Sequence, residues 1–187
     1  PFADMAAVKD EEVVIVRGRG ARVWDADGKE YVDARAGLWY AAVGHGRPEI
    51  ADAVAAQMRE LAAFDTFERL ANRPALELAE RVSSLAPFPD AAVFFGSGGS
   101  DAVDTAAKLA RRYWSAVGKP GKVVLVGRSY AYHGMHAFGT TLGGIPANVE
   151  GLGDLVTDVA HVDALSVEAL EAELARLGPE RVAAFIG

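Results

Sequence analysis

The chain has 187 residues, of which 51% are hydrophobic, and it carries a formal net charge of −7 without any cysteine. This composition supports a buried core, excludes disulfides and thiolate ligands, and argues against a nucleic-acid-binding surface. No apolar run approaches the roughly 20 residues of a membrane-spanning helix, and the first residues do not resemble a secretion signal. We therefore expect a cytoplasmic protein with neither a membrane nor a nucleic acid as partner.

Short strands and tight turns are predicted in the N-terminal third, with strands at 13–16, 21–25 and 30–33. Asp27-Gly28 lies between the last two, and both residue types tolerate positive φ, which favours a hairpin. Two helices are expected next, each with a proline in its first turn, at about 48–61 and 74–85.

Strands then alternate with helices, an order that predicts a parallel α/β sheet. The expected elements are a strand at 91–95, a helix at about 101–117, a strand at 122–126, a loop at 127–153, a helix at about 166–177 and a strand at 181–186. The second and last of these strands are apolar without alternation, which is typical of strands covered on both faces.

Two domains are expected: residues 1–73 as an N-terminal segment of strands, hairpin and helix, and residues 74–187 as the first part of a larger α/β domain. The chain does not begin with methionine, and its last predicted strand ends at the last residues. We therefore expect it to be a piece of a longer protein.

A glycine-rich turn, Gly96-Ser97-Gly98-Gly99-Ser100, lies between the strand at 91–95 and the helix at 101–117. Glycines let backbone N–H groups approach a ligand, and a helix N-terminus supplies unpaired donors and partial positive charge, so the turn predicts a phosphate site. The spacing fits neither the P-loop nor the dinucleotide fingerprint. A single phosphate ester remains, bound by backbone amides and the hydroxyls of Ser97 and Ser100.

An aromatic loop, Tyr130-Ala131-Tyr132-His133-Gly134, follows the strand at 122–126. Loops that leave the carboxyl ends of parallel strands meet at one edge, so an aromatic ring can cover a ligand bound at the turn, and a planar phosphate ester is suggested. Taken alone, Tyr132 could equally be an aromatic residue that packs in the protein, and His133 and His136 could be ordinary surface or core histidines. The spacing of these histidines is poor for zinc, and no metal site is expected.

The segment 94–114 resembles the phosphate-binding segment of class III, or omega, aminotransferases, which are pyridoxal 5′-phosphate (PLP) enzymes of fold type I. Further matches occur in the right order at 37–39, 43–50, 77–81, 132–134 and 184–187. The resemblance implies a PLP-dependent transferase-like α/β domain, incomplete here, in which helices cover both faces of a parallel or mixed sheet. It also implies that the N-terminal segment belongs to a small domain.

The resemblance also implies roles for individual residues. Gly99 and Ser100 match the pair that binds the cofactor phosphate, whereas Gly98 stands where many members have a serine, an absence for which Ser97 can compensate. Asp101 replaces a glutamate. The remaining matches are Tyr132, which would stack on the pyridine ring, His133 in the same motif, and the aromatic residues of the substrate pocket, Trp39, Phe64 and Phe67.

The implied reaction is transamination between an amine or omega-amino acid and a keto acid such as pyruvate, in a homodimer. The catalytic lysine and the aspartate that binds the pyridine nitrogen are expected after Gly187, so this chain should contain no catalytic residue and should not transaminate alone. Alternatives are a PLP-dependent aminomutase or decarboxylase of the same fold, or a naturally short, non-catalytic module that binds a phosphate ester. Trp39 and the segment 64–67 favour the aminotransferase.

Overall fold

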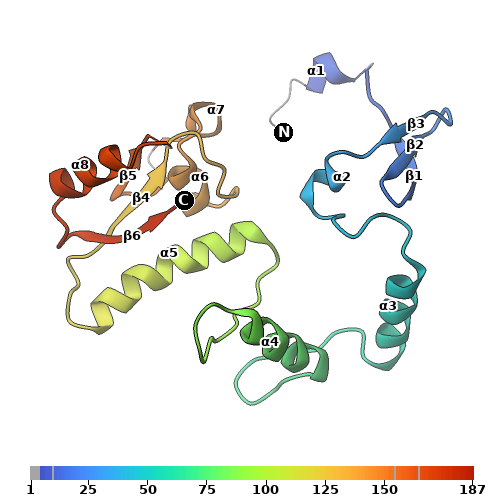
Figure 1. The fold of residues 1–187 in the computed structure, drawn as a ribbon, viewed down its shortest axis with the longest axis horizontal. Helices are drawn as coiled ribbons and strands as arrows, with labels where there is room; N and C mark the ends of the chain where they lie inside the picture. The colour runs from blue at the N-terminus through green and yellow to red at the C-terminus, as the bar shows by residue number, and fades with distance from the viewer. Residues whose placement is uncertain (1–4, 10, 154, 164) are drawn as a thin grey trace. The chain divides into compact units, whose positions relative to one another are not determined.

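The structure is a computed structural model that describes residues 5–9, 11–153, 155–163 and 165–187. The chain forms two compact units, Pro1–Val93 and Phe94–Gly187, which are described separately (Figure 1). The helix expected at 74–85 belongs to the first of these units. The domain boundary expected between residues 73 and 74 stays a prediction.

Among the residues that the structure describes, the first unit contains a small antiparallel sheet and four helices, and its sheet has the strand order β1-β2-β3. Its elements are α1 (Met5–Val8), β1 (Ile15–Arg19), β2 (Arg22–Asp25), β3 (Glu30–Val32), α2 (Ala36–Trp39), α3 (Pro48–Glu60) and α4 (Arg73–Leu85). The three expected strands and two long helices are therefore present, although the first strand begins two residues later than predicted.

Asp25 fixes the predicted hairpin between β2 and β3. Its carboxylate accepts hydrogen bonds from the backbone N–H groups of Asp27 (3.1 Å) and Lys29 (2.8 Å) and from the Tyr31 hydroxyl (2.7 Å). Gly28 takes the left-handed conformation that the turn requires, with φ of 84°. The Tyr31 hydroxyl is the largest of the influences that lower the pKa of Asp25, so the carboxylate stays ionised and the turn stays closed.

Both long helices of the first unit begin as the sequence predicts. Pro48 lies in the first turn of α3, where its missing N–H costs no hydrogen bond. Asn72 caps α4, because its side-chain oxygen accepts a hydrogen bond from the Ala75 N–H at 3.0 Å. The apolar side chains of Ile50, Val54 and Met58 on α3 are exposed in the part of the chain that the structure describes.

The second unit contains the parallel sheet that the sequence predicts, with the strand order β5-β4-β6. Its central strand places Leu125 beside Val159 of β5 and Ala184 of β6. The elements are α5 (Gly99–Ala116), β4 (Val124–Arg128), α6 (Ala137–Gly143), α7 (Pro146–Val149), β5 (Val159–Val162), α8 (Val167–Leu177) and β6 (Val182–Ile186).

Helices cover both faces of this sheet, which confirms the prediction. On one face Leu125 packs in a core cluster with Ala107 of α5 and Leu142 of α6. On the other face Val124 and Val126 pack with leucines of α8. Successive residues of β4 thus enter opposite clusters, which accounts for a strand that is apolar at every position.

Two sequence predictions in this half of the chain were wrong, and one strand was missed. Residues 91–95 form no strand, because no described strand lies beside them to pair with their backbone, and Phe94 and Phe95 remain exposed. The expected loop at 127–153 contains α6 and α7, and β5 was missed because His161 interrupts its apolar pattern. The strand expected at 122–126 is present, although it begins two residues later than predicted, at Val124. Within the described ranges, none of the helices has the length and apolar character needed to cross a membrane.

Candidate functional site

The glycine-rich turn leads directly into α5, the longest described helix. Two side chains of α5 attach it to the sheet: the Trp114 indole N–H donates to the Ala183 carbonyl at 2.7 Å, and Arg111 Nε donates to the Val123 carbonyl at 2.8 Å. Because α5 is held at its C-terminal half and through Ala107 in the core, its N-terminus has a fixed position relative to the strands.

A hollow opens at the N-terminus of α5. Gly98 is the residue that precedes the helix, and its extended backbone is one that any residue adopts. A Cβ added to Gly98 or Gly99 would meet no atom within 4 Å, so neither packing nor backbone conformation in the described structure requires glycine there. A ligand that approaches the backbone would require it. The hollow is lined by Ser97, Gly98, Gly99, Ser100, Asp101 and His136.

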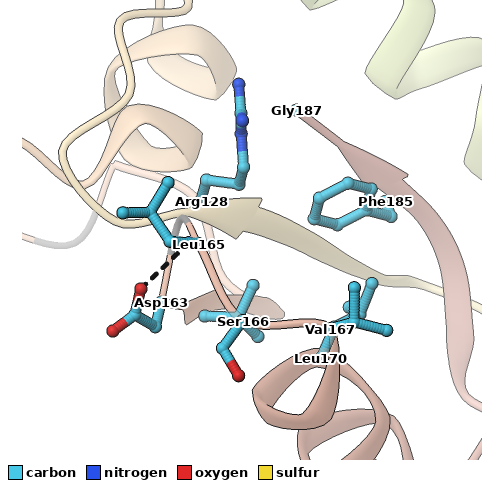
Figure 2. Close-up of a pocket in the computed structure, with 9 residues that line it drawn as sticks. Arg128, Asp163, Leu165, Ser166, Val167, Leu170, Phe185 and Gly187 are labelled. Atoms are coloured by element: carbon cyan, nitrogen blue, oxygen red, sulfur yellow. Dashed lines mark hydrogen bonds between the residues drawn. The ribbon is translucent and has the colours of Figure 1, made fainter.

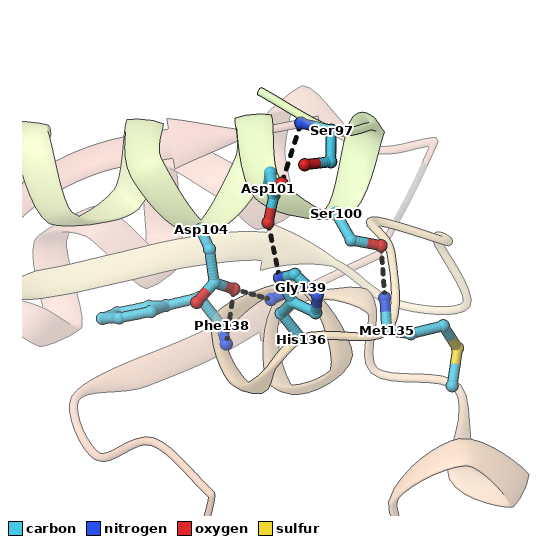
Figure 3. Close-up of polar contacts among 8 residues, drawn as sticks. All are labelled: Ser97, Ser100, Asp101, Asp104, Met135, His136, Phe138 and Gly139. Carbon is cyan, nitrogen blue, oxygen red and sulfur yellow. Dashed lines mark hydrogen bonds and ion pairs between the residues drawn. The ribbon is translucent and has the colours of Figure 1, made fainter. Parts of the chain in front are cut away.

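Asp101 stabilises the glycine-rich turn by a hydrogen bond and faces His136 (Figure 3). Its Oδ2 accepts a hydrogen bond from the Ser97 N–H at 2.8 Å, and its Oδ1 lies 3.4 Å from His136 Nδ1. Hydrogen bonding from Ser97 is the main cause of a lowered Asp101 pKa, and the charges of His136 and Lys108 contribute less. The carboxylate is therefore ionised near neutral pH.

The aromatic loop that follows β4 is attached to the same helix. The Met135 N–H donates to Ser100 Oγ at 3.0 Å, which leaves the hydroxyl hydrogen of Ser100 able to donate to a ligand. Gly134 has φ of 97°, and a Cβ there would lie 2.6 Å from Ser100 Oγ, so only glycine fits at this contact. The two loops are predicted from the sequence to meet at one edge of the sheet, and this hydrogen bond joins them.

Tyr132 and His133 lie on this loop but do not line the hollow. The Tyr132 side chain is 64% exposed, so its ring is free to contact a ligand. His133 Nε2 is buried and has no hydrogen-bond partner among the described residues. Burial, followed by the charge of Arg128, lowers the pKa of His133, so the imidazole is neutral near neutral pH.

Trp39, Phe64 and Phe67, expected to form the substrate pocket, belong to the first unit. Their exposed fractions are 87%, 54% and 73%, so they do not serve as core residues within that unit. Trp39 ends a left-handed turn, α2, in which all four residues have positive φ. The carboxylate of Asp33 accepts a hydrogen bond from the Gly37 N–H at 2.8 Å and thereby holds this turn.

A second hollow lies at the carboxyl ends of β4 and β5 (Figure 2). Apolar side chains, among them Leu165, Leu170 and Phe185, form most of its wall. Arg128 Nε is buried and has no hydrogen-bond partner in the described ranges. The sequence predicts no ligand at these residues, and the predicted phosphate site lies in the other hollow.

Four predicted residues, Ser97 to Ser100, thus come together around one hollow, and Tyr132 and His133 are joined to it through the Ser100 contact. Sequence reasoning missed His136 as a residue of this hollow. The signal that could have found it is its distance of three residues from His133, on a loop already expected at the phosphate turn. Its pairing with Asp101 depends on tertiary structure.

Comparison with known proteins identifies the family. The sequence model described as "Aminotransferase class-III" matches residues 5–186. The putrescine–pyruvate aminotransferase of Pseudomonas aeruginosa is 36% identical in an alignment that covers 100% of this chain and 45% of that protein.

Solved structures agree with this assignment. An (S)-enantioselective omega-transaminase from Thermomicrobium roseum has 39% identity and a TM-score of 0.93, with 100% of this chain and 45% of that chain covered. A PLP-bound amine transaminase from an uncultivated Pseudomonas species has 36% identity and a TM-score of 0.90, with 98% and 46% covered. The chain spans about half the length of these relatives, and it belongs to the class III aminotransferase family.

Proposed function

We propose that the protein to which this chain belongs is a PLP-dependent transaminase that transfers an amino group from an amine or omega-amino acid to a keto acid such as pyruvate. The hollow at the N-terminus of α5 carries this proposal, because its open glycines and its connection to the aromatic loop suit a planar phosphate ester. Membership of the class III aminotransferase family supports it, as does the PLP-bound relative.

The residues at the hollow fit the phosphate group of PLP. Backbone N–H groups in the first turn of α5 have no intrahelical acceptor, and together with the helix dipole they attract an anion. Gly98 and Gly99 leave the space in front of those donors open. The hydroxyls of Ser97 and Ser100 add donors, and Gly99 and Ser100 are the pair that we assign to the phosphate.

The ring of the cofactor would lie against the aromatic loop. We assign stacking on the pyridine ring to Tyr132, whose side chain is exposed, and a supporting role to the neutral His133 beside it. PLP, when bound, supplies an electron sink for negative charge at the substrate carbon. The chain's contribution is to bind and orient that group, and no catalytic residue is assigned within residues 1–187.

The substrate pocket is assigned to Trp39, Phe64 and Phe67, which would form its aromatic wall. Their exposure within the first unit supports this role, because none of them is needed as a core residue there. We also propose a homodimer in the cytoplasm. The exposed apolar side chains on α3 support the homodimer, because a second subunit would cover them.

The experiment that tests this function is an activity assay of the full-length protein with PLP, an amine and pyruvate. We expect the carbonyl product and alanine in equal amounts, and no turnover from a protein of residues 1–187 alone. Carbon dioxide release would identify a decarboxylase and a rearranged amine an aminomutase, and either result would contradict the proposal. A stop codon directly after Gly187 would contradict it as well.

A further inference from the structure

His136 lines the same hollow as the glycine-rich turn, although it lies more than thirty residues further along the chain. It is the residue that precedes α6, and its side chain is half exposed. Figure 3 shows it between Asp101 and the first turn of α6. Its ring therefore faces a site at which we propose that a phosphate group binds.

Hydrogen bonds on both sides of His136 fix its backbone to α5. On one side the Met135 N–H donates to Ser100 Oγ at 3.0 Å. On the other side Asp104 Oδ1 accepts from the N–H groups of Phe138 at 3.1 Å and Gly139 at 3.3 Å. Because three main-chain groups within five residues are attached to one helix, the position of His136 at the hollow is built into the fold.

The pairing with Asp101 sets the orientation of the imidazole. His136 Nδ1 lies 3.4 Å from Asp101 Oδ1, whereas His136 Nε2 has no hydrogen-bond partner among the described residues. An imidazole whose Nδ1 faces a carboxylate presents its other nitrogen to whatever occupies the space beyond. The second nitrogen is thus left for a ligand in the hollow.

A cation beside the Asp101 carboxylate would favour the binding of an anion in the hollow. Asp101 is ionised, and an uncompensated carboxylate beside a phosphate group would repel it. Lys108, on the same helix, also acts on Asp101, but it does not line the hollow. His136 is the lining residue able to carry positive charge, and it stands next to the carboxylate that must be offset.

We propose that His136 is a further phosphate-binding residue of this chain: Asp101 holds its Nδ1, and its Nε2 N–H donates to an oxygen of the cofactor phosphate. This inference rests on the proposed function, since it assumes that a cofactor phosphate occupies the hollow. It adds an imidazole N–H donor to a hollow otherwise lined by backbone N–H groups, hydroxyls and the Asp101 carboxylate.

The test measures dissociation constants of the full-length protein, freed of cofactor, for pyridoxamine phosphate and for pyridoxamine. These ligands differ only in the phosphate group, and neither carries the aldehyde that would react with a lysine. We expect His136→Ala to weaken pyridoxamine phosphate binding about tenfold, the size of a charge-assisted hydrogen bond at a half-exposed site, and to leave pyridoxamine binding unchanged. His136→Arg, which keeps a side-chain N–H donor, should restore most of the affinity.

Lys108→Gln is the matched control, because it removes one positive charge from α5 without altering the hollow, and it should change the affinity less than His136→Ala does. Wild-type protein that binds pyridoxamine phosphate no better than pyridoxamine would overturn the proposed function and this inference together. If wild type prefers the phosphate ligand but His136→Ala weakens both ligands equally, or neither, only the role of His136 is overturned. A far-UV circular dichroism spectrum of each variant separates lost binding from lost folding.

Discussion

At the scale of single residues, the glycine-rich turn points to a ligand because two of its glycines are not required by the packing of the chain itself. Gly134 is explained within the chain, because a Cβ would strike Ser100 and its φ is left-handed. Gly98 and Gly99 have no such explanation, since a Cβ at either would enter open space. Glycine at those two positions is best accounted for by the close approach of a ligand to the backbone.

His133 gives a pH-dependent prediction at the same scale. Its pKa in the folded chain is lowered, so the unfolded chain binds the proton more readily. The contribution of neutral His133 to the free energy of unfolding should be fully present above the unfolded pKa of about 6.5. It should be lost as the pH is lowered through that value toward the folded pKa. Urea denaturation at about pH 7.5 and about pH 5.5, without cofactor, measures this loss.

The control for this prediction is His133→Gln, which has no proton to bind in either state. We expect the wild type to lose more unfolding free energy between the two pH values than the variant loses. Equal losses in both proteins would show that the buried, unpaired Nε2 of His133 does not oppose protonation.

At the scale of elements, those that depend on local sequence signals could be predicted, whereas those that depend on tertiary pairing alone could not. The helices beginning at Pro48 and near Pro74 could be predicted, because the first-turn proline and the helical spacing of apolar residues are local features. The run 91–95 is apolar, as a buried strand is, yet it forms no strand. A strand exists only where a neighbouring strand pairs with its backbone hydrogen-bonding groups. The sequence of α6 contains glycines and threonines, and packing of Leu142 in the core compensates for its weak helix propensity.

The cap of α4 allows a prediction about an element. Asn72 accepts from the Ala75 N–H and also donates to the Phe64 carbonyl at 3.4 Å. Asn72→Ala should lower the free energy of unfolding by about 1 kcal/mol, a typical value for a lost helix N-cap, as measured by urea denaturation. Asn72→Asp is the control, because aspartate keeps the acceptor and loses only the contact with Phe64. An alanine variant as stable as the wild type would contradict a stabilising cap.

At the scale of the whole molecule, the chain contains a unit with a parallel sheet, to which we assign the cofactor, and a first unit with exposed aromatic side chains. The sequence predicted the parallel sheet and the helices on both of its faces, because apolar strands that alternate with helices are a local pattern. The phosphate-binding role of the turn stays a prediction. It did not predict that His136 and Asp101 face each other, because that pairing depends on how the loop after β4 returns to α5. The roles assigned to Trp39, Phe64 and Phe67 stay predictions.

The central claim is that the turn at the N-terminus of α5 binds the phosphate of PLP, and Gly99→Ala in the full-length protein tests it most directly. The new methyl group meets no atom of the described residues within 4 Å, so the variant should be at least as stable as the wild type. The methyl group would occupy the space assigned to the phosphate, so the dissociation constant for pyridoxamine phosphate should rise about tenfold or more. Gly121→Ala, where a Cβ also meets no atom, is the matched control outside the hollow and should bind like the wild type. Wild-type affinity in the Gly99→Ala variant would contradict the claim.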